Sequence, residues 1–183
     1  MSDLKSWERP RIINIIIDND SWILPWSERL AVQLRRDGDE VHIIRRLEDV
    51  KAGSVAFYIG CLNITPPDIL ARNLRNLVIH ASDLPLGRGF SPWTWMILEG
   101  HTDIPVCLIE AAEKVDSGSI IYKDYIALEG HELINEIRTL IGDKTVELCT
   151  RFINAASPPT GVSQVGEATW YRRRYPIDNE IDP

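Results

Sequence analysis

Apolar runs of strand length recur along this chain and alternate with stretches in which apolar residues keep helical spacing. The first run, residues 11–17, is built largely from isoleucine and is apolar nearly throughout, which is typical of a parallel strand covered on both faces. The pattern predicts strands at residues 11–17, 41–44, 54–60, 77–79, 104–111 and 120–128.

Helical spacing of apolar residues fills the segments between these runs. Over residues 26–37, Leu30 and Leu34 share one face, and Gly38 ends the segment. A bend or break is expected at Gly142 in the longest helical segment. Further helices are predicted at residues 68–74, 93–98 and 131–155. The alternation predicts an α/β fold of the doubly wound, Rossmann-like type, with a mostly parallel sheet flanked by helices.

The chain length and charge restrict the class of protein. At 183 residues one domain is expected, so we assign residues 1–157 to an α/β domain and residues 158–183 to a C-terminal extension that packs on it. The formal charge of −7 disfavours a nucleic-acid partner, because phosphate binding needs a basic face. No apolar run approaches the length of a membrane span, and the N-terminus lacks a signal-peptide pattern, so a cytoplasmic protein without membrane association is predicted.

The three cysteines are scattered along the chain, without the CxxC spacing of a metal site and without a disulfide framework. We expect free, buried thiols in a reducing compartment and no metal ion.

His80 follows the apolar run at residues 77–79, and a polar loop containing glycine comes after it. Open α/β sheets usually place their chemistry at the carboxyl ends of buried strands, where a histidine can exchange protons near neutral pH. A single histidine beside an apolar strand is nevertheless more often a hydrogen-bonded structural residue. Spacing alone leaves both interpretations open.

Three segments carry a resemblance to one family. The sequence HASDLPLGRGFSPWTW, residues 80–95, resembles the signature loop of the folate-dependent formyltransferases, which include the methionyl-tRNA, glycinamide ribonucleotide and sugar N-formyltransferases. VDSGSI at residues 115–120 is similar to the family's Asp-x-Gly-x-Ile motif. EATWY at residues 167–171 resembles a further family segment that ends in Ile-Asp, matched here by Ile181 and Asp182. Two motifs in the right order are much more specific than either alone.

The resemblance implies the fold of the formyltransferase N-terminal domain and an enzyme that uses 10-formyltetrahydrofolate as co-substrate. It implies that His80 and Asp116 form the catalytic pair, in which the imidazole handles protons or hydrogen-bonds an oxyanion and the carboxylate orients the imidazole. The residues that it assigns to folate are Leu62, Asn63, Thr65, Ser82 and Gly118, and those that it assigns to the acceptor are Arg88, Gly89 and Glu167.

The chain departs from the family at one catalytic position. The family's asparagine, two residues before the histidine, is Val78 here, and valine cannot donate a hydrogen bond to an oxyanion. Losing one such donor typically costs on the order of 100- to 1000-fold in rate. Asn76, Asn63 or Ser82 could supply the missing donor. The alternative is a non-transferring protein on the same scaffold, either a formyl hydrolase or a folate- or ligand-binding protein.

The acceptor is predicted to be a small-molecule amine, with an amino sugar or a sugar nucleotide favoured. The acidic charge argues against tRNA. Asp18 and Asp20, which stand where ribonucleotide enzymes of the family carry a phosphate loop, argue against a phosphoribosyl substrate and are interpreted as turn and helix-cap residues. The basic run at residues 172–174 is either a solvated patch or a contact to substrate phosphate. Assembly into a homodimer is left open.

Overall fold

The computed structural model describes residues 7–179. Its centre is a six-stranded sheet in the order β2-β1-β3-β4-β6-β7. The first four of these strands are parallel, whereas β6 runs antiparallel to both of its neighbours. The strands are β1 (Ile12–Ile16), β2 (Glu40–Ile44), β3 (Gly53–Tyr58), β4 (Asn73–His80), β6 (Asp103–Glu110) and β7 (Ile120–Ala127). The predicted α/β class, with a mostly parallel sheet, is confirmed.

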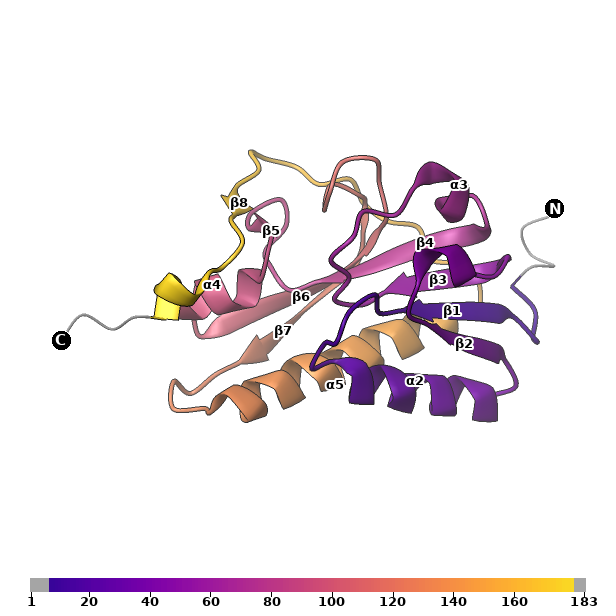
Figure 1. Cartoon of the computed structure of the whole chain (residues 1–183), viewed down its shortest axis with the longest axis horizontal. Coiled ribbons are helices and arrows are strands. Elements are labelled where there is room, and N and C mark those ends of the chain that lie inside the picture. The colour runs from indigo at the N-terminus through magenta and orange to yellow at the C-terminus, as the bar shows by residue number, and fades with distance from the viewer. Residues whose placement is uncertain (1–6, 180–183) are drawn as a thin grey trace.

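One face of the sheet is covered by α2 (Leu24–Arg36) and α5 (Ile134–Ile153), which run beneath it in Figure 1. No helix within residues 7–179 is long and apolar enough to cross a bilayer. The remaining elements are the 3-10 turns η1 (Leu47–Asp49) and η2 (Pro176–Asn179), the short helices α3 (Pro67–Leu70) and α4 (Pro92–Leu98), and a two-stranded sheet of β5 (Arg88–Gly89) and β8 (Trp170–Tyr171).

The hydrophobic core lies on both faces of the central strands. Ile13 of β1 packs with Leu30 of α2 and Phe152 of α5, and all three side chains are fully buried. The next residues of the strand alternate in direction, so Ile16 faces the opposite side and packs with Ile69 of α3. Burial on both faces explains why β1 is apolar at every position except Asn14 rather than alternating.

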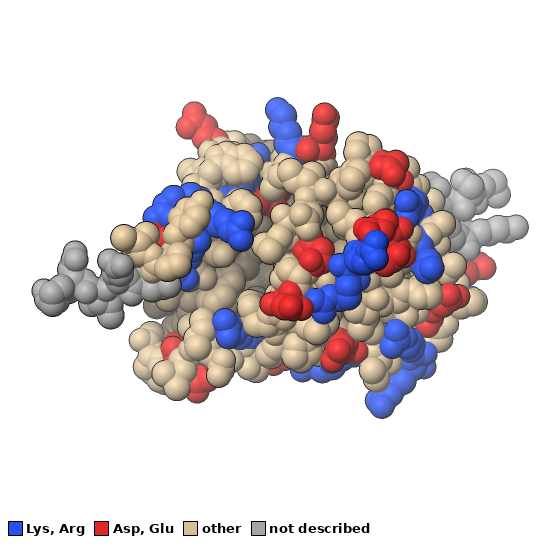
Figure 2. Space-filling model, viewed as in Figure 1, with Lys and Arg blue, Asp and Glu red and all other residues tan. Residues whose placement is uncertain are grey.

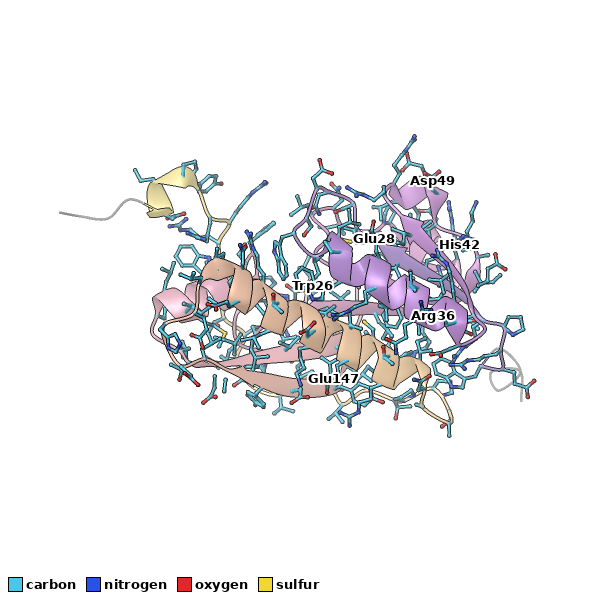
Figure 3. All side chains as sticks on the ribbon, turned by 90° about the horizontal axis from the view of Figure 1, so that it is seen from below. Trp26, Glu28, Arg36, His42, Asp49 and Glu147 are labelled. Carbon is cyan, nitrogen blue, oxygen red and sulfur yellow. The ribbon has the colours of Figure 1, made fainter. Side chains whose placement is uncertain are left out.

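Helix α5 runs unbroken through Gly142, so the predicted break at this residue is wrong. A Cβ here would lie 2.5 Å from the ring of Trp26 on α2. The absent side chain therefore lets the two helices approach closely, and the Trp26 Nε1 donates a hydrogen bond to Asp143 at 3.0 Å. Figure 3 shows Trp26 between the two helices, with Glu147 on α5 and Arg36 on α2. Close packing offsets the roughly 1 kcal/mol that glycine costs inside a helix.

The helix predicted at residues 68–74 ends early, because α3 stops at Leu70 and β4 begins at Asn73. Asn73 is buried, and its Oδ1 accepts a hydrogen bond from the Asn14 Nδ2 at 2.9 Å. The first half of β4 was not predicted as a strand, because polar side chains that hydrogen-bond to each other within the sheet stand there in place of apolar ones.

Candidate active site

A cavity of about 560 Å³ opens at the carboxyl ends of β1, β3 and β4. The chain leaves β1 for β2 on one side and later forms β3 on the other side of β1. The carboxyl ends of these strands therefore form a topological switch point, where open α/β sheets bind ligands. The lining residues fall within 19–23, 58–65, 78–81, 89–93 and 109–116, together with Leu70 of α3 and two residues of α5. Figure 2 shows a hollow in this face of the molecule, with Lys and Arg atoms near its edge.

His80 and Asp116 meet at this cavity although they lie far apart in the chain. His80 is the last residue of β4, and Asp116 belongs to the loop between β6 and β7. The His80 Nδ1 lies 3.4 Å from the Asp116 Oδ1, and the two side chains are only 7% and 9% exposed. Both residues line the cavity. The structure therefore holds an imidazole beside a carboxylate in a largely buried position, an arrangement that is suited to acid–base catalysis.

The loop after β4 closes over this pair with two backbone contacts. The His80 Nε2 lies 2.9 Å from the carbonyl oxygen of Gly87, and the Gly89 N–H donates to the Asp116 Oδ2 at 2.9 Å. Both ring nitrogens of His80 thus face oxygen atoms, and an imidazole with a hydrogen on each nitrogen can donate to both. Asp116 has a φ of +53°, a left-handed conformation that only glycine adopts without cost.

Val78 lies two residues before His80 on β4, so the two side chains project from the same face of the sheet. Val78 lines the cavity, and it packs among the apolar residues Leu84 and Ile109. The wall beside His80 is consequently apolar at the position where the formyltransferase family carries an asparagine.

The three candidate replacement donors already have partners. The Asn76 Nδ2 donates to the Leu70 carbonyl at 2.9 Å, and the Ser82 Oγ donates to the Leu86 carbonyl at 2.9 Å. Neither Asn76 nor Ser82 lines the cavity. Asn63 does line it, but its Nδ2 donates to Asp18 at 2.8 Å.

The remaining predicted site residues divide into two groups. Leu62, Asn63, Thr65 and Gly89 line the cavity, whereas Ser82, Arg88, Gly118 and Glu167 do not. Gly118 lies against the backbone of β6, where a Cβ would come within 1.8 Å of the Glu110 carbonyl oxygen. Glu167 is exposed, and the Arg88 Nη2 donates to Gln164 at 2.6 Å.

Asp18 holds the segment that carries Leu62 and Asn63. Its carboxylate accepts hydrogen bonds from the backbone N–H groups of both residues at 2.8 Å. Burial alone would raise the pKa of Asp18, but the hydrogen bonds from Asn19, Leu62 and Asn63 together hold this pKa below its ordinary value. The acid predicted as a turn and cap residue therefore orders one wall of the cavity.

Sequence reasoning missed several aromatic side chains of the cavity. Tyr58, Trp22, Phe90 and Trp93 all line it, and Tyr58 stands beside Val78 in the register of β3 and β4. Burial raises the pKa of Tyr58 to about 12, so its hydroxyl stays protonated at neutral pH. A bulky aromatic residue next to a turn was the available signal, but it does not distinguish a pocket wall from a core.

The three cysteines are free, as expected, although Cys61 is only partly buried. Burial raises the pKa of the Cys61 thiol to about 12 and that of the Cys107 thiol to about 11. Within residues 7–179, no group of three or more His, Cys, Asp or Glu side chains is arranged to hold a metal ion.

Comparison of the sequence with known proteins shows which proteins this chain resembles. No family model matches the sequence. The chain is 24% identical over 179 residues to a GDP-perosamine N-formyltransferase of Brucella melitensis, which aligns 85% of this chain with 69% of that protein. Against a methionyl-tRNA formyltransferase of Rickettsia prowazekii the identity is 25% over 80% of this chain, but the chain spans only about half the length of that relative, 52%.

Solved structures agree with the sequence relatives. A methionyl-tRNA formyltransferase from Clostridium thermocellum superposes with a TM-score of 0.74 at 24% identity, over 94% of this chain and 76% of that one. PseJ from Anoxybacillus kamchatkensis, solved with UDP-4,6-dideoxy-4-formamido-L-AltNAc and tetrahydrofolate, superposes with a TM-score of 0.64 at 21% identity, over 87% of this chain and 85% of that one.

The fold is that of a formyltransferase domain. The resemblance to the formyltransferase family and the expectation of a transferase are confirmed by these relatives.

Proposed function

We propose that this protein transfers the formyl group of 10-formyltetrahydrofolate to the amine of an amino sugar, and that the sugar is carried on a nucleotide. The observation that supports this most directly is the buried contact between His80 and Asp116 at the end of β4, beside a cavity of about 560 Å³. The GDP-perosamine N-formyltransferase relative and the sugar-nucleotide complex of PseJ support the acceptor class.

The cavity has the features that a reduced folate needs. Its rim carries the exposed apolar side chains of Leu62, Ile64, Phe90 and Val115, which can cover flat aromatic rings. Polar groups lie deeper, where the hydroxyl of Tyr58 and the side chain of Thr65 can meet a heterocycle. We therefore assign the segment 61–65 to the folate, which supplies the formyl carbon.

His80 carries the proton transfers in the proposed reaction. The acceptor amine attacks the formyl carbon and gives up a proton to His80, and the carbonyl oxygen becomes an oxyanion. When the oxyanion collapses back to a carbonyl, the bond between the formyl carbon and the folate N10 breaks, and N10 takes the proton from His80. Because the His80 Nδ1 faces Asp116, the Nε2 is the atom that can exchange protons with the substrates. A substrate must then replace the Gly87 carbonyl as the partner of Nε2. Asp116 stabilises the ring when it is positively charged.

Two arginines near the cavity support an anionic acceptor. The Arg138 guanidinium lies 5.8 Å from the Trp22 ring centroid, and that of Arg173 lies 6.0 Å from the Phe90 ring centroid; both rings line the cavity. Within the described part of the chain, neither guanidinium is within ion-pair distance of a carboxylate. The Arg138 Nε is also buried without a hydrogen-bond partner. Because guanidinium groups pair well with phosphate oxygens, we assign these two cations to the diphosphate of a nucleotide sugar.

The test combines the purified protein with 10-formyltetrahydrofolate and a panel of amino sugars linked to GDP, UDP or dTDP. Tetrahydrofolate is followed by its absorbance and the formylated sugar by mass spectrometry. Formyl loss that requires an amine is the expected result. Formyl loss without any amine would replace this proposal with the hydrolase.

A non-transferring protein is the second candidate, and the apolar wall at Val78 is the observation that favours it. Folate binding without formyl loss under any condition would establish this alternative.

The three free cysteines fit a reducing cytoplasm, where we place the reaction. A homodimer stays a prediction, which the molecular mass in solution would test.

Asp18→Ala is expected to raise the KM for 10-formyltetrahydrofolate about 10-fold while kcat changes little, because the segment 61–65 loses the carboxylate that orders it. Folding lowers the pKa of Asp18, so its stabilisation is present above the ordinary carboxyl value of about 4 and is lost as the pH falls through the lower folded value. The KM should therefore rise in acid in the parent protein only.

The matched control is Asp20→Ala, which replaces an exposed acid that pairs with Arg45. An unchanged KM in Asp18→Ala would contradict the assignment of this segment to folate.

A further inference from the structure

We infer that Gln164 is a positioning residue that holds Asp116 against His80, an inference that rests on the proposed function for its kinetic consequence. The Gln164 Nε2 donates to the backbone carbonyls of Asp116 and Gly118, each at 2.8 Å. Its Oε1 accepts a hydrogen bond from the Arg88 Nη2 at 2.6 Å. A glutamine amide has two N–H groups, and both are used on one loop, on either side of residue 117.

The loop that carries Asp116 needs such support. Asp116 is held at a φ of +53°, a left-handed conformation that is unfavourable for a residue with a Cβ. Two contacts oppose its relaxation, because Gln164 binds its carbonyl oxygen and the Gly89 N–H binds its carboxylate. The isolated bridge between Ile120 and Val162 brings the C-terminal segment alongside this loop, as Figure 1 also shows.

Gln164 also joins the two segments that surround the imidazole. Arg88, its third partner, lies on β5 directly between Gly87, whose carbonyl faces the His80 Nε2, and Gly89, whose N–H binds Asp116. The segment around β5 is itself fixed to the C-terminal segment, because the Gly87 N–H donates to the Thr169 Oγ1 at 2.8 Å. Gln164 therefore sets the position of the loop after β4 relative to the loop after β6, and so the separation of imidazole and carboxylate.

This role has a kinetic signature that a general loss of stability lacks. Gln164 does not line the cavity, so its replacement leaves the walls in place and changes the orientation of the catalytic pair. Misplacing a reacting group by about 1 Å can cost on the order of 100-fold in rate. The effect should fall on kcat, with the KM values for both substrates changed by no more than about twofold.

The experiment compares two variants with the parent protein. Gln164→Met keeps the length of the side chain without its polar atoms, and Gln164→Glu keeps the contact to Arg88 but sets a carboxylate oxygen against two carbonyls. Both should lower kcat by about 10- to 100-fold. In NMR-detected exchange, the Gly89 amide should exchange at least about 10-fold faster, because Asp116 no longer accepts its hydrogen bond steadily. The control is Val165→Ala, the neighbouring side chain, which is 86% exposed.

The exchange measurement does not depend on enzyme activity. If the parent protein shows no formyl transfer, the proposed function fails, while faster Gly89 exchange in the two variants still supports the positioning role. Unchanged Gly89 exchange in folded Gln164→Met would overturn the inference, and so would a raised KM with an unchanged kcat.

Discussion

Asp116→Asn is expected to lower kcat by about 100- to 10,000-fold without unfolding the protein. The carboxylate lies 3.4 Å from the His80 Nδ1, so its negative charge both orients the imidazole and stabilises the ring when it accepts a proton. Asparagine removes that charge with almost no change in shape. It also tolerates the left-handed backbone at this position better than most residues, and its side-chain oxygen can still accept from the Gly89 N–H.

The measurement is steady-state kinetics with 10-formyltetrahydrofolate and the acceptor, together with thermal unfolding of each variant. His80→Ala should fall to a similar rate, and the double variant should be little worse than either single one, because the two residues act as a unit. Asp103→Asn, an exposed acid at the start of β6, is the matched control and should behave like the parent. Near-normal kcat in both folded single variants would show that this pair does not carry the chemistry.

Most strands of the central sheet were predictable from the sequence, and most clearly the inner strands β1, β3 and β6, which are covered on both faces and consist largely of apolar runs. The direction of β6 was not, since an apolar run such as Ile104–Ile109 reads the same in a parallel and in an antiparallel strand. The first half of β4 was also missed, because Asn73 and Asn76 satisfy their amides within the protein and so replace apolar side chains. A hydrophobic pattern identifies strands whose buried residues are apolar, and it does not identify strands whose buried polar residues are hydrogen-bonded to each other.

The candidate site could be predicted only through the family resemblance. No periodicity links His80 with Asp116, whose contact depends on the path of the chain between β6 and β7. Gln164 lies in a polar segment without any pattern, and its role appears only when its three partners are seen together. Motif residues also have structural reasons for their identity: a Cβ on Gly89 would lie 2.4 Å from the Tyr171 carbonyl oxygen, whatever Gly89 does for a substrate.

Val78→Asn is expected to raise kcat for formyl transfer on the order of 100-fold, because it places an amide donor on the His80 face of β4, where the wall of the cavity is apolar. The variant should lose about 1 to 2 kcal/mol of stability, since part of the amide is buried among Leu84 and Ile109. The measurement is kcat with and without the amine, and Val78→Leu, which adds volume but no donor, is the control. A rise that occurs only with amine would show that the missing donor limits transfer in this chain. If Val78→Asn is no faster than Val78→Leu, another group already stabilises the oxyanion. The nearest candidate is the hydroxyl of the neighbouring Tyr58, which lies 3.3 Å from the Asn76 Oδ1, and Tyr58→Phe would test it.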